Sequence, residues 1–228
     1  MVKPAEFERV IVDTTVQEKA IAHPVDSRLL EIARSKIVQA AKRSGITLKQ
    51  SYAKEGKELR RKAGGYAHAK QFRRMHKTVK RQRTILGIVL REIKRKLATT
   101  ELGCSASLQP LNTLLERAQR IHKQQPKDKN KLYALHAPEV ECIGKGKARK
   151  PYEFGVKASI AITHKNGLMI GAKTFPGNPY DGHILHKQLT QTQILLENAG
   201  STPKQVIVDL GFRSVDTDNP DVNIIHRG

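Results

Sequence analysis

The sequence contains no tryptophan, and aromatic residues make up only 4% of its 228 positions. So few rings argue against a surface that reads single-stranded nucleic acid by stacking on its bases. The two cysteines, Cys104 and Cys142, are far apart in the chain, which excludes a disulfide framework and a cysteine zinc site. No apolar run reaches the roughly 18 residues of a membrane-spanning helix, so we expect no membrane partner.

Acidic residues are scarce relative to basic ones. The 42 Lys and Arg residues and 21 Asp and Glu residues give a formal net charge of +21. Such a charge favours a polyanionic partner, most simply double-stranded DNA, in a cytoplasmic, nucleoid-associated setting. The excess is concentrated in residues 41–100, which hold 19 basic and 3 acidic residues. The remainder is nearly neutral, which indicates a basic module joined to an ordinary globular domain.

Apolar residues at helical spacing predict that residues 27–125 are all-helical. A first helix is expected from Ser27 to near residue 45, followed by a break at the Gly64-Gly65 pair. A long helix is expected over residues 66–97, where apolar side chains recur at steps of three and four. A shorter amphipathic helix is expected over residues 108–121. Three such helices predict a bundle with a basic outer face.

Short β-branched runs replace the helical pattern after residue 126. Residues 152–164 and 168–175 predict two antiparallel strands joined at Asn166-Gly167, a dipeptide typical of a hairpin turn. The remaining expected elements are a strand over 8–14, a helix over 183–198 and a strand over 204–209. We therefore expect one domain from residues 1–26 and 126–228, interrupted by a helical domain of residues 27–125.

The sequence Val-Ile-Val-Asp occurs twice, at residues 10–13 and 206–209. Each run suits a buried strand and ends in an acid. If the strands are parallel neighbours, Asp13 and Asp209 lie about 5 Å apart. Carboxylates this close repel unless a cation lies between them, and Mg²⁺ or Mn²⁺ suits such oxygen ligands. Two such ions about 4 Å apart support phosphodiester cleavage or transfer. The spacing fits equally well with each Asp merely capping the turn after its strand.

Four motifs follow one another along the chain: VDTTVQEK at residues 12–19, KGKARKPYEFG at 145–155, GNPYDGH at 177–183 and DLGFR at 209–213. In this order they resemble bacterial insertion-sequence transposases of the DDE class. The resemblance implies an α/β fold, with a ribonuclease-H-like mixed sheet and a large basic all-helical insertion after the first strand. The strand, hairpin, helix and returning strand expected above suit that core.

The resemblance also implies a function. It implies DNA cleavage and strand transfer in DNA transposition, with two divalent metal ions as cofactors. Asp13 and Asp209 correspond to the first and second catalytic, metal-binding acids. Because transposases commonly act on paired element ends, the resemblance further implies a homodimer.

The chain departs from the family around and beyond its second acid. Where the family usually has Asp-Arg-Gly-Tyr-Arg, this chain has Leu210 and Phe212 in place of the first Arg and the Tyr. The family's third acid, a Glu on a later helix, has no counterpart, since no Glu follows Asp209. We therefore expect a truncated, DNA-binding fragment that is catalytically incomplete on its own.

Basic side chains are expected to contact DNA phosphates without reading sequence, although a solvated charged face is the simpler alternative. The predicted contacts lie on a helix and in a loop: Arg73, Arg74, Lys77, Lys80, Arg81, Arg83, Lys145, Lys147, Arg149 and Lys150. Asp181 is expected to cap the helix that follows it, with a role in the site as the alternative. Glu153 is expected to be solvated or paired with a lysine.

Two other functions stay open on the sequence alone. One is a metal-dependent nuclease in which another acid substitutes for the missing Glu. The other is a basic nucleic-acid-binding protein without catalysis. The separation of Asp13 and Asp209 distinguishes them, because acids that lie far apart would leave only the non-catalytic protein.

Overall fold

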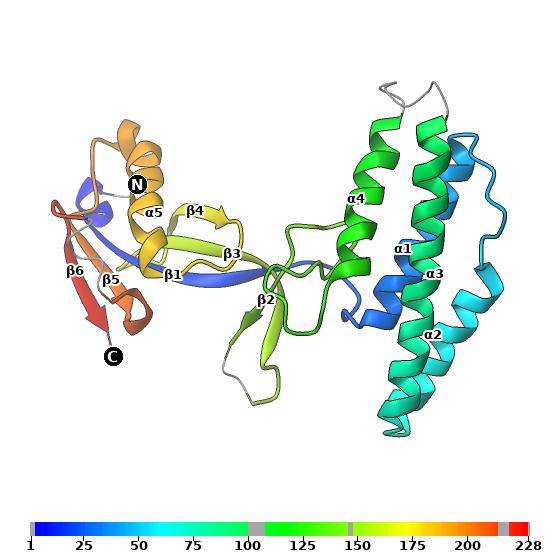
Figure 1. Cartoon of the computed structure of the whole chain (residues 1–228). Coiled ribbons are helices and arrows are strands. Elements are labelled where there is room, and N and C mark those ends of the chain that lie inside the picture. The colour runs from blue at the N-terminus through cyan, green and yellow to red at the C-terminus, as the bar shows by residue number, and fades with distance from the viewer. Residues whose placement is uncertain (1–2, 100–107, 146–147, 214–218, 228) are drawn as a thin grey trace. The chain divides into compact units, whose positions relative to one another are not determined.

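The chain forms two compact units in a computed structural model that describes residues 3–99, 108–145, 148–213 and 219–227. The first, here the sheet unit, comprises Met1–Ala20 and Glu139–Gly228, and the second, the helical unit, comprises Ile21–Pro138 (Figure 1). The division after residue 138 rather than 125 has a physical reason, because Leu132 and Leu135 pack into the helical core. Among the described residues, no helix is long and apolar enough to cross a membrane.

The described part of the helical unit contains four helices. These are α1 (Asp26–Arg43), α2 (Ala53–His68), α3 (Phe72–Thr99) and α4 (Gln109–Lys123). Helix α1 packs against the other three, and α2 and α4 each pack on α3. Aliphatic side chains such as Ile37, Leu86 and Leu115 fill the core between α1, α3 and α4. Of the net charge of +21, +20 belongs to this unit.

The long helix predicted over residues 66–97 is confirmed as α3, but it begins at Phe72 rather than at residue 66. Gly64 and Gly65 lie inside α2, and the chain turns at Lys70, whose φ is +56°, before α3 begins at Phe72. The apolar pattern missed α2 because this lysine- and arginine-rich helix buries only Gly56 and Ala63. A helix that approaches its neighbours through such small residues shows no apolar stripe.

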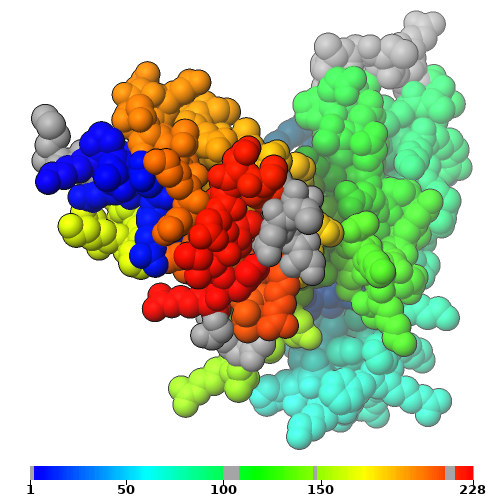
Figure 2. All heavy atoms as spheres, turned by 90° about the vertical axis from the view of Figure 1, so that its left-hand side faces the viewer, coloured from blue at the N-terminus to red at the C-terminus, as the bar shows by residue number. Residues whose placement is uncertain are grey.

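The sheet unit is a mixed sheet with a helix on one face. Its described strands are β1 (Arg9–Glu18), β2 (Glu141–Gly144), β3 (Tyr152–Thr163), β4 (Met169–Phe175), β5 (Gln205–Asp209) and β6 (Asn223–Arg227). They lie in the order β2-β3-β1-β5-β6, and β4 pairs with β3. Strand β1 is antiparallel to β3 and parallel to β5, which is in turn parallel to β6. In Figure 2 the last strand, β6, lies at the surface of this unit.

Helix α5 (Gly182–Leu196) packs over β3 and β4. A Cβ atom at Gly171 of β4 would lie 2.5 Å from Thr192 Oγ1 and 2.7 Å from Gln188 Nε2, so the glycine lets this helix approach closely. The hairpin predicted at Asn166-Gly167 is confirmed, and Gly167 has the positive φ (+62°) that such a turn requires.

Candidate active site

Asp13 and Asp209 lie on neighbouring strands. Strands β1 and β5 run parallel, and their register pairs Arg9 with Gln205, Val10 with Val206 and Ile11 with Ile207. The paired residues end at Ile11 and Ile207, and the same offset continued for two residues would set Asp13 opposite Asp209, at the spacing of about 4.8 Å between adjacent strands.

The alternation of side chains places both acids on one face of the sheet. The valines at positions 10, 12, 206 and 208 are buried in the core that includes Leu185 and Leu189 of α5. Because successive side chains of a strand point to opposite faces, Asp13 and Asp209 belong to the face away from this helix. Both side chains are exposed.

Each carboxylate is oriented by one backbone N–H group. The N–H of Thr14 donates to Asp13 Oδ1 at 2.7 Å, and the N–H of Gly211 donates to Asp209 Oδ1 at 2.8 Å. The second bond caps the short helix η5 (Leu210–Phe212), so Asp209 does cap the turn after its strand. Asp13 does not end a strand, since β1 continues to Glu18. Among the described residues, Oδ2 of each acid has no hydrogen bond.

Two carboxylates in this arrangement suit a hard divalent cation. Mg²⁺ usually takes one or two protein carboxylates and completes its coordination with water and substrate phosphate oxygens. The described residues contain no group of three or more His, Cys, Asp or Glu side chains that could hold a metal ion. Asp13 and Asp209 thus form a partial ligand set that needs oxygen atoms from elsewhere.

A third carboxylate, that of Asp181, lies beside Asp209. Asp181 precedes α5, but its side chain makes no capping hydrogen bond. The prediction that Asp181 caps this helix was therefore wrong. Instead, Asp181 Oδ1 pairs with Lys157 Nζ at 2.6 Å. A Cβ atom placed on Gly211 would lie 2.9 Å from Asp209 Oδ1 and 3.2 Å from Asp181 Oδ2, so both carboxylates flank the same glycine.

The predicted basic cluster on α3 divides into exposed and internally bonded side chains. Arg83 Nη1 donates to the carbonyl oxygens of His122 and Gln124 at 2.8 Å each, which ties α3 to the end of α4. Arg81 forms a bidentate pair with Glu55. The other four side chains of the cluster are exposed: Arg73, Arg74, Lys77 and Lys80. Of these, Arg74 also donates to Gln71 Oε1 at 3.0 Å.

The predicted basic loop is partly neutralised. Lys150 Nζ pairs with Glu18 and also lies 3.7 Å from Glu153 Oε1. The hydrogen bond to Glu18 is the main cause of a raised pKa of Lys150. Arg149 is exposed and Lys145 is half-buried, whereas Lys147 lies outside the described residues.

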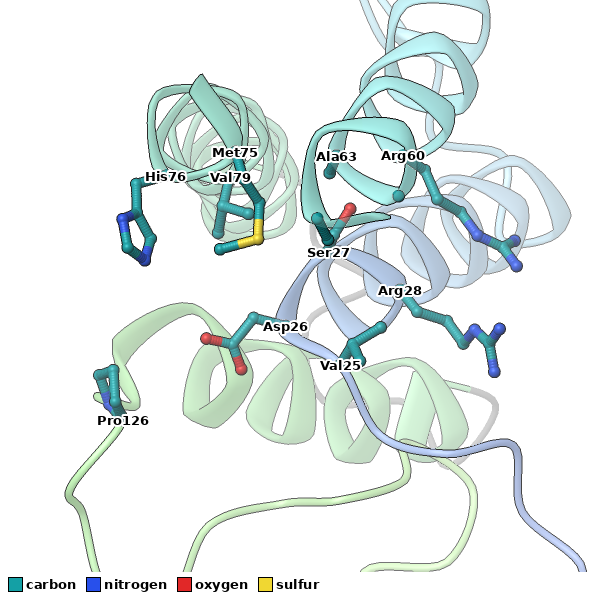
Figure 3. A pocket seen from close by; sticks show the side chains of 12 residues that line it. Val25, Asp26, Ser27, Arg28, Arg60, Ala63, Met75, His76, Val79 and Pro126 are labelled. Atoms are coloured by element: carbon teal, nitrogen blue, oxygen red, sulfur yellow. The ribbon is translucent and has the colours of Figure 1, made fainter. Parts of the chain in front are cut away.

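The helical unit has a cavity of about 460 Å³. Its walls come from the start of α1, from α2 and from α3, and include Val25, Ala63, Met75 and Val79 (Figure 3). Arg28 extends away from its centre (Figure 3). Most of the lining surface is apolar, although Asp26, Arg60 and His76 also line the cavity.

Residues 119–217 match the family model described as "Transposase DDE domain". This span includes Lys157, Asp181 and Asp209. An uncharacterized protein of Rhizobium meliloti, ORF8 in the nfe locus, is 54% identical over 70 residues, which are 31% of this chain and 34% of that protein. The matched part thus spans about a third of the relative's length. No solved structure matches the chain. Residues 119–217 are thus similar to the DDE domain of transposases.

Proposed function

We propose that the chain is the part of a DNA transposase that carries two metal-binding acids and a surface for the DNA backbone. The parallel register of β1 and β5 supports the proposal, because its continuation by two residues would bring Asp13 and Asp209 to adjacent positions on one face. The order β4-β3-β1-β5-β6, with α5 between β4 and β5, further supports a ribonuclease-H-like core. The helical unit is then an insertion between β1 and the rest of the sheet.

Asp13 and Asp209 would hold Mg²⁺ or Mn²⁺ through their Oδ2 atoms. When bound, such ions activate an attacking oxygen and stabilise the leaving oxygen of a phosphodiester. The two backbone N–H donors fix the carboxylates through Oδ1 and so leave the other oxygen available. No Glu occurs among residues 210–228, so these residues supply no counterpart of the family's third acid.

The DNA-contacting surface is a stripe along α3. At 100° per residue, one line of the helix carries Arg73, Lys77, Lys80, Arg91 and Arg95, and all five are exposed. Buried residues such as Gln82 and Val89 lie on the opposite side of the same helix. The rise from Arg73 to Arg95 is about 33 Å, close to one turn of B-DNA. This α3 stripe is suited to contact successive phosphates without reading bases.

Titration with Mn²⁺, followed by the electron paramagnetic resonance signal of the free ion, tests the metal site. Asp13→Asn and Asp209→Asn should each weaken Mn²⁺ binding by about 10-fold or more. Glu197→Gln removes the same charge from another exposed position in the sheet unit and should leave the affinity unchanged. Equal affinities of all three variants and the unmodified chain would refute the proposal.

A nicking assay separates the proposal from the nuclease alternative. The chain should bind supercoiled plasmid in the presence of Mn²⁺ without cutting it. Nicking that Asp13→Asn abolishes would instead assign a complete metal-dependent nuclease. DNA binding combined with no Mn²⁺ affinity would leave only a non-catalytic DNA-binding protein.

A further inference from the structure

A partly buried ion pair, between Lys157 and Asp181, lies next to the turn that follows Asp209. Lys157, on β3, is only 9% exposed. Its ammonium group pairs with Asp181 Oδ1 at 2.6 Å and donates to the carbonyl oxygen of Pro179 at 2.7 Å. Lys157 thereby attaches the loop before α5 to the sheet. Breaking such a pair leaves an uncompensated charge, so the two side chains hold each other in place.

Gly211 connects this pair to Asp209. Its N–H donates to Asp209 Oδ1, and a Cβ atom at this position would meet that oxygen and Asp181 Oδ2 at 2.9 and 3.2 Å. The φ of Gly211 is not positive, so a glycine is required here because a side chain would not fit, and not because of an unusual backbone conformation. The Asp181 carboxylate therefore lies against the backbone that orients Asp209.

We propose that Lys157 and Asp181 are positioning residues for Asp209. Lys157 fixes Asp181, Asp181 supports the turn at Gly211, and Gly211 holds the Asp209 carboxylate in the orientation that binds a metal ion. This inference rests on the proposed role of Asp209 as a metal ligand. It assigns a role to two side chains that do not themselves need to touch the ion.

If Lys157 acted only through its charge, its removal would change the Mn²⁺ affinity in the opposite direction from the loss of a positioning residue. A lysine ammonium near a metal site repels a divalent cation, so its removal should strengthen Mn²⁺ binding if Lys157 acted only through its field. If Lys157 acts by holding Asp181 in place, its removal should weaken Mn²⁺ binding. The sign of the change therefore distinguishes positioning from electrostatics.

The test uses the full chain and two measurements. Lys157→Met and Asp181→Asn should each weaken Mn²⁺ binding by about 10-fold, as is typical when a partner of a metal ligand is removed. In the metal-free protein, the amide proton of Gly211 should exchange faster in both variants, as followed by NMR. Lys165→Met removes an exposed lysine at the hairpin turn and should change neither measurement.

A double variant, Lys157→Met/Asp181→Leu, guards against loss of the fold. Replacing both members of a buried pair by apolar groups is often neutral for stability. The double variant should therefore fold, yet bind Mn²⁺ more weakly than the unmodified chain.

The outcomes separate the two proposals. Tighter or unchanged Mn²⁺ binding by Lys157→Met, with binding still dependent on Asp13, would overturn the positioning role and leave the proposed function intact. Unchanged exchange at Gly211 would also overturn it. An unmodified chain that binds no Mn²⁺ would overturn both proposals.

Discussion

Removing two cations from the α3 stripe should lower the salt dependence of DNA binding by a calculable amount. Each phosphate contact contributes about −0.9 to the slope of log affinity against log salt concentration, so five contacts predict a slope of about −4.5. The variant Lys77→Ala/Lys80→Ala removes two contacts and predicts about −2.7. From 50 to 200 mM NaCl, the unmodified chain should lose about 500-fold in affinity and the variant only about 40-fold.

Fluorescence anisotropy with a labelled duplex of about 20 base pairs, or two helical turns, measures these slopes. Two unrelated duplex sequences should behave alike, because phosphate contacts carry no sequence information. The control Lys165→Ala/Lys187→Ala removes the same charge from exposed positions of the sheet unit. An equal decrease in slope for both variants would show that net charge matters and the α3 stripe does not. No decrease in either variant would show that α3 does not contact DNA.

Four further predictions concern the helical unit and are checked by urea denaturation. Gly56→Ala should destabilise the chain by about 1–3 kcal/mol, because the new Cβ atom would meet Glu31 Oε2 and lie 2.7 Å from Arg34 Nε. Gly64→Ala, in the same helix with nothing within 4 Å, should stabilise it by up to about 1 kcal/mol. Arg34→Met should lower the free energy of unfolding by about 3–5 kcal/mol, because it leaves the carboxylate of Glu31 buried without its bidentate partner. Adding Glu31→Leu to this variant should recover most of the lost stability. Burial, with a smaller effect of nearby cations, lowers the pKa of His122 below its ordinary value of 6.5. The free energy of unfolding should therefore rise with pH up to about 6.5 and then level off. The variant His122→Gln should flatten that rise.

Local signals in the sequence predicted the centre of the sheet. The repeated Val-Ile-Val-Asp run marked β1 and β5 because both strands are buried inside the sheet and have the same alternation. The Asn166-Gly167 dipeptide marked the turn between β3 and β4, since few other residues adopt its backbone conformation. The short edge strands β2 and β6 carried no such signal, because they bury few side chains.

Features that depend on tertiary contacts could not be predicted in this way. Nothing local to Asp181 indicates that it will lie beside Asp209, because the contact is made through Lys157 on a different strand and through the bare backbone of Gly211. Arg83 illustrates the same difficulty on the basic helix. Its position in a run of cations predicted a DNA contact, whereas its guanidinium group bonds two carbonyl oxygens at the end of α4.

The division of charge between the units separates the proposed DNA and metal interactions. The sheet unit has 14 basic and 13 acidic residues, whereas the helical unit has 28 and 8. DNA affinity should therefore come mainly from the helical unit and should fall steeply as the salt concentration rises. A metal ion held between Asp13 and Asp209 lies well within the Debye length of about 10 Å at 0.1 M salt, so its affinity should change by no more than about threefold between 50 and 200 mM NaCl. A parallel loss of Mn²⁺ and DNA affinity would show that diffuse charge, rather than these two carboxylates, holds the ion.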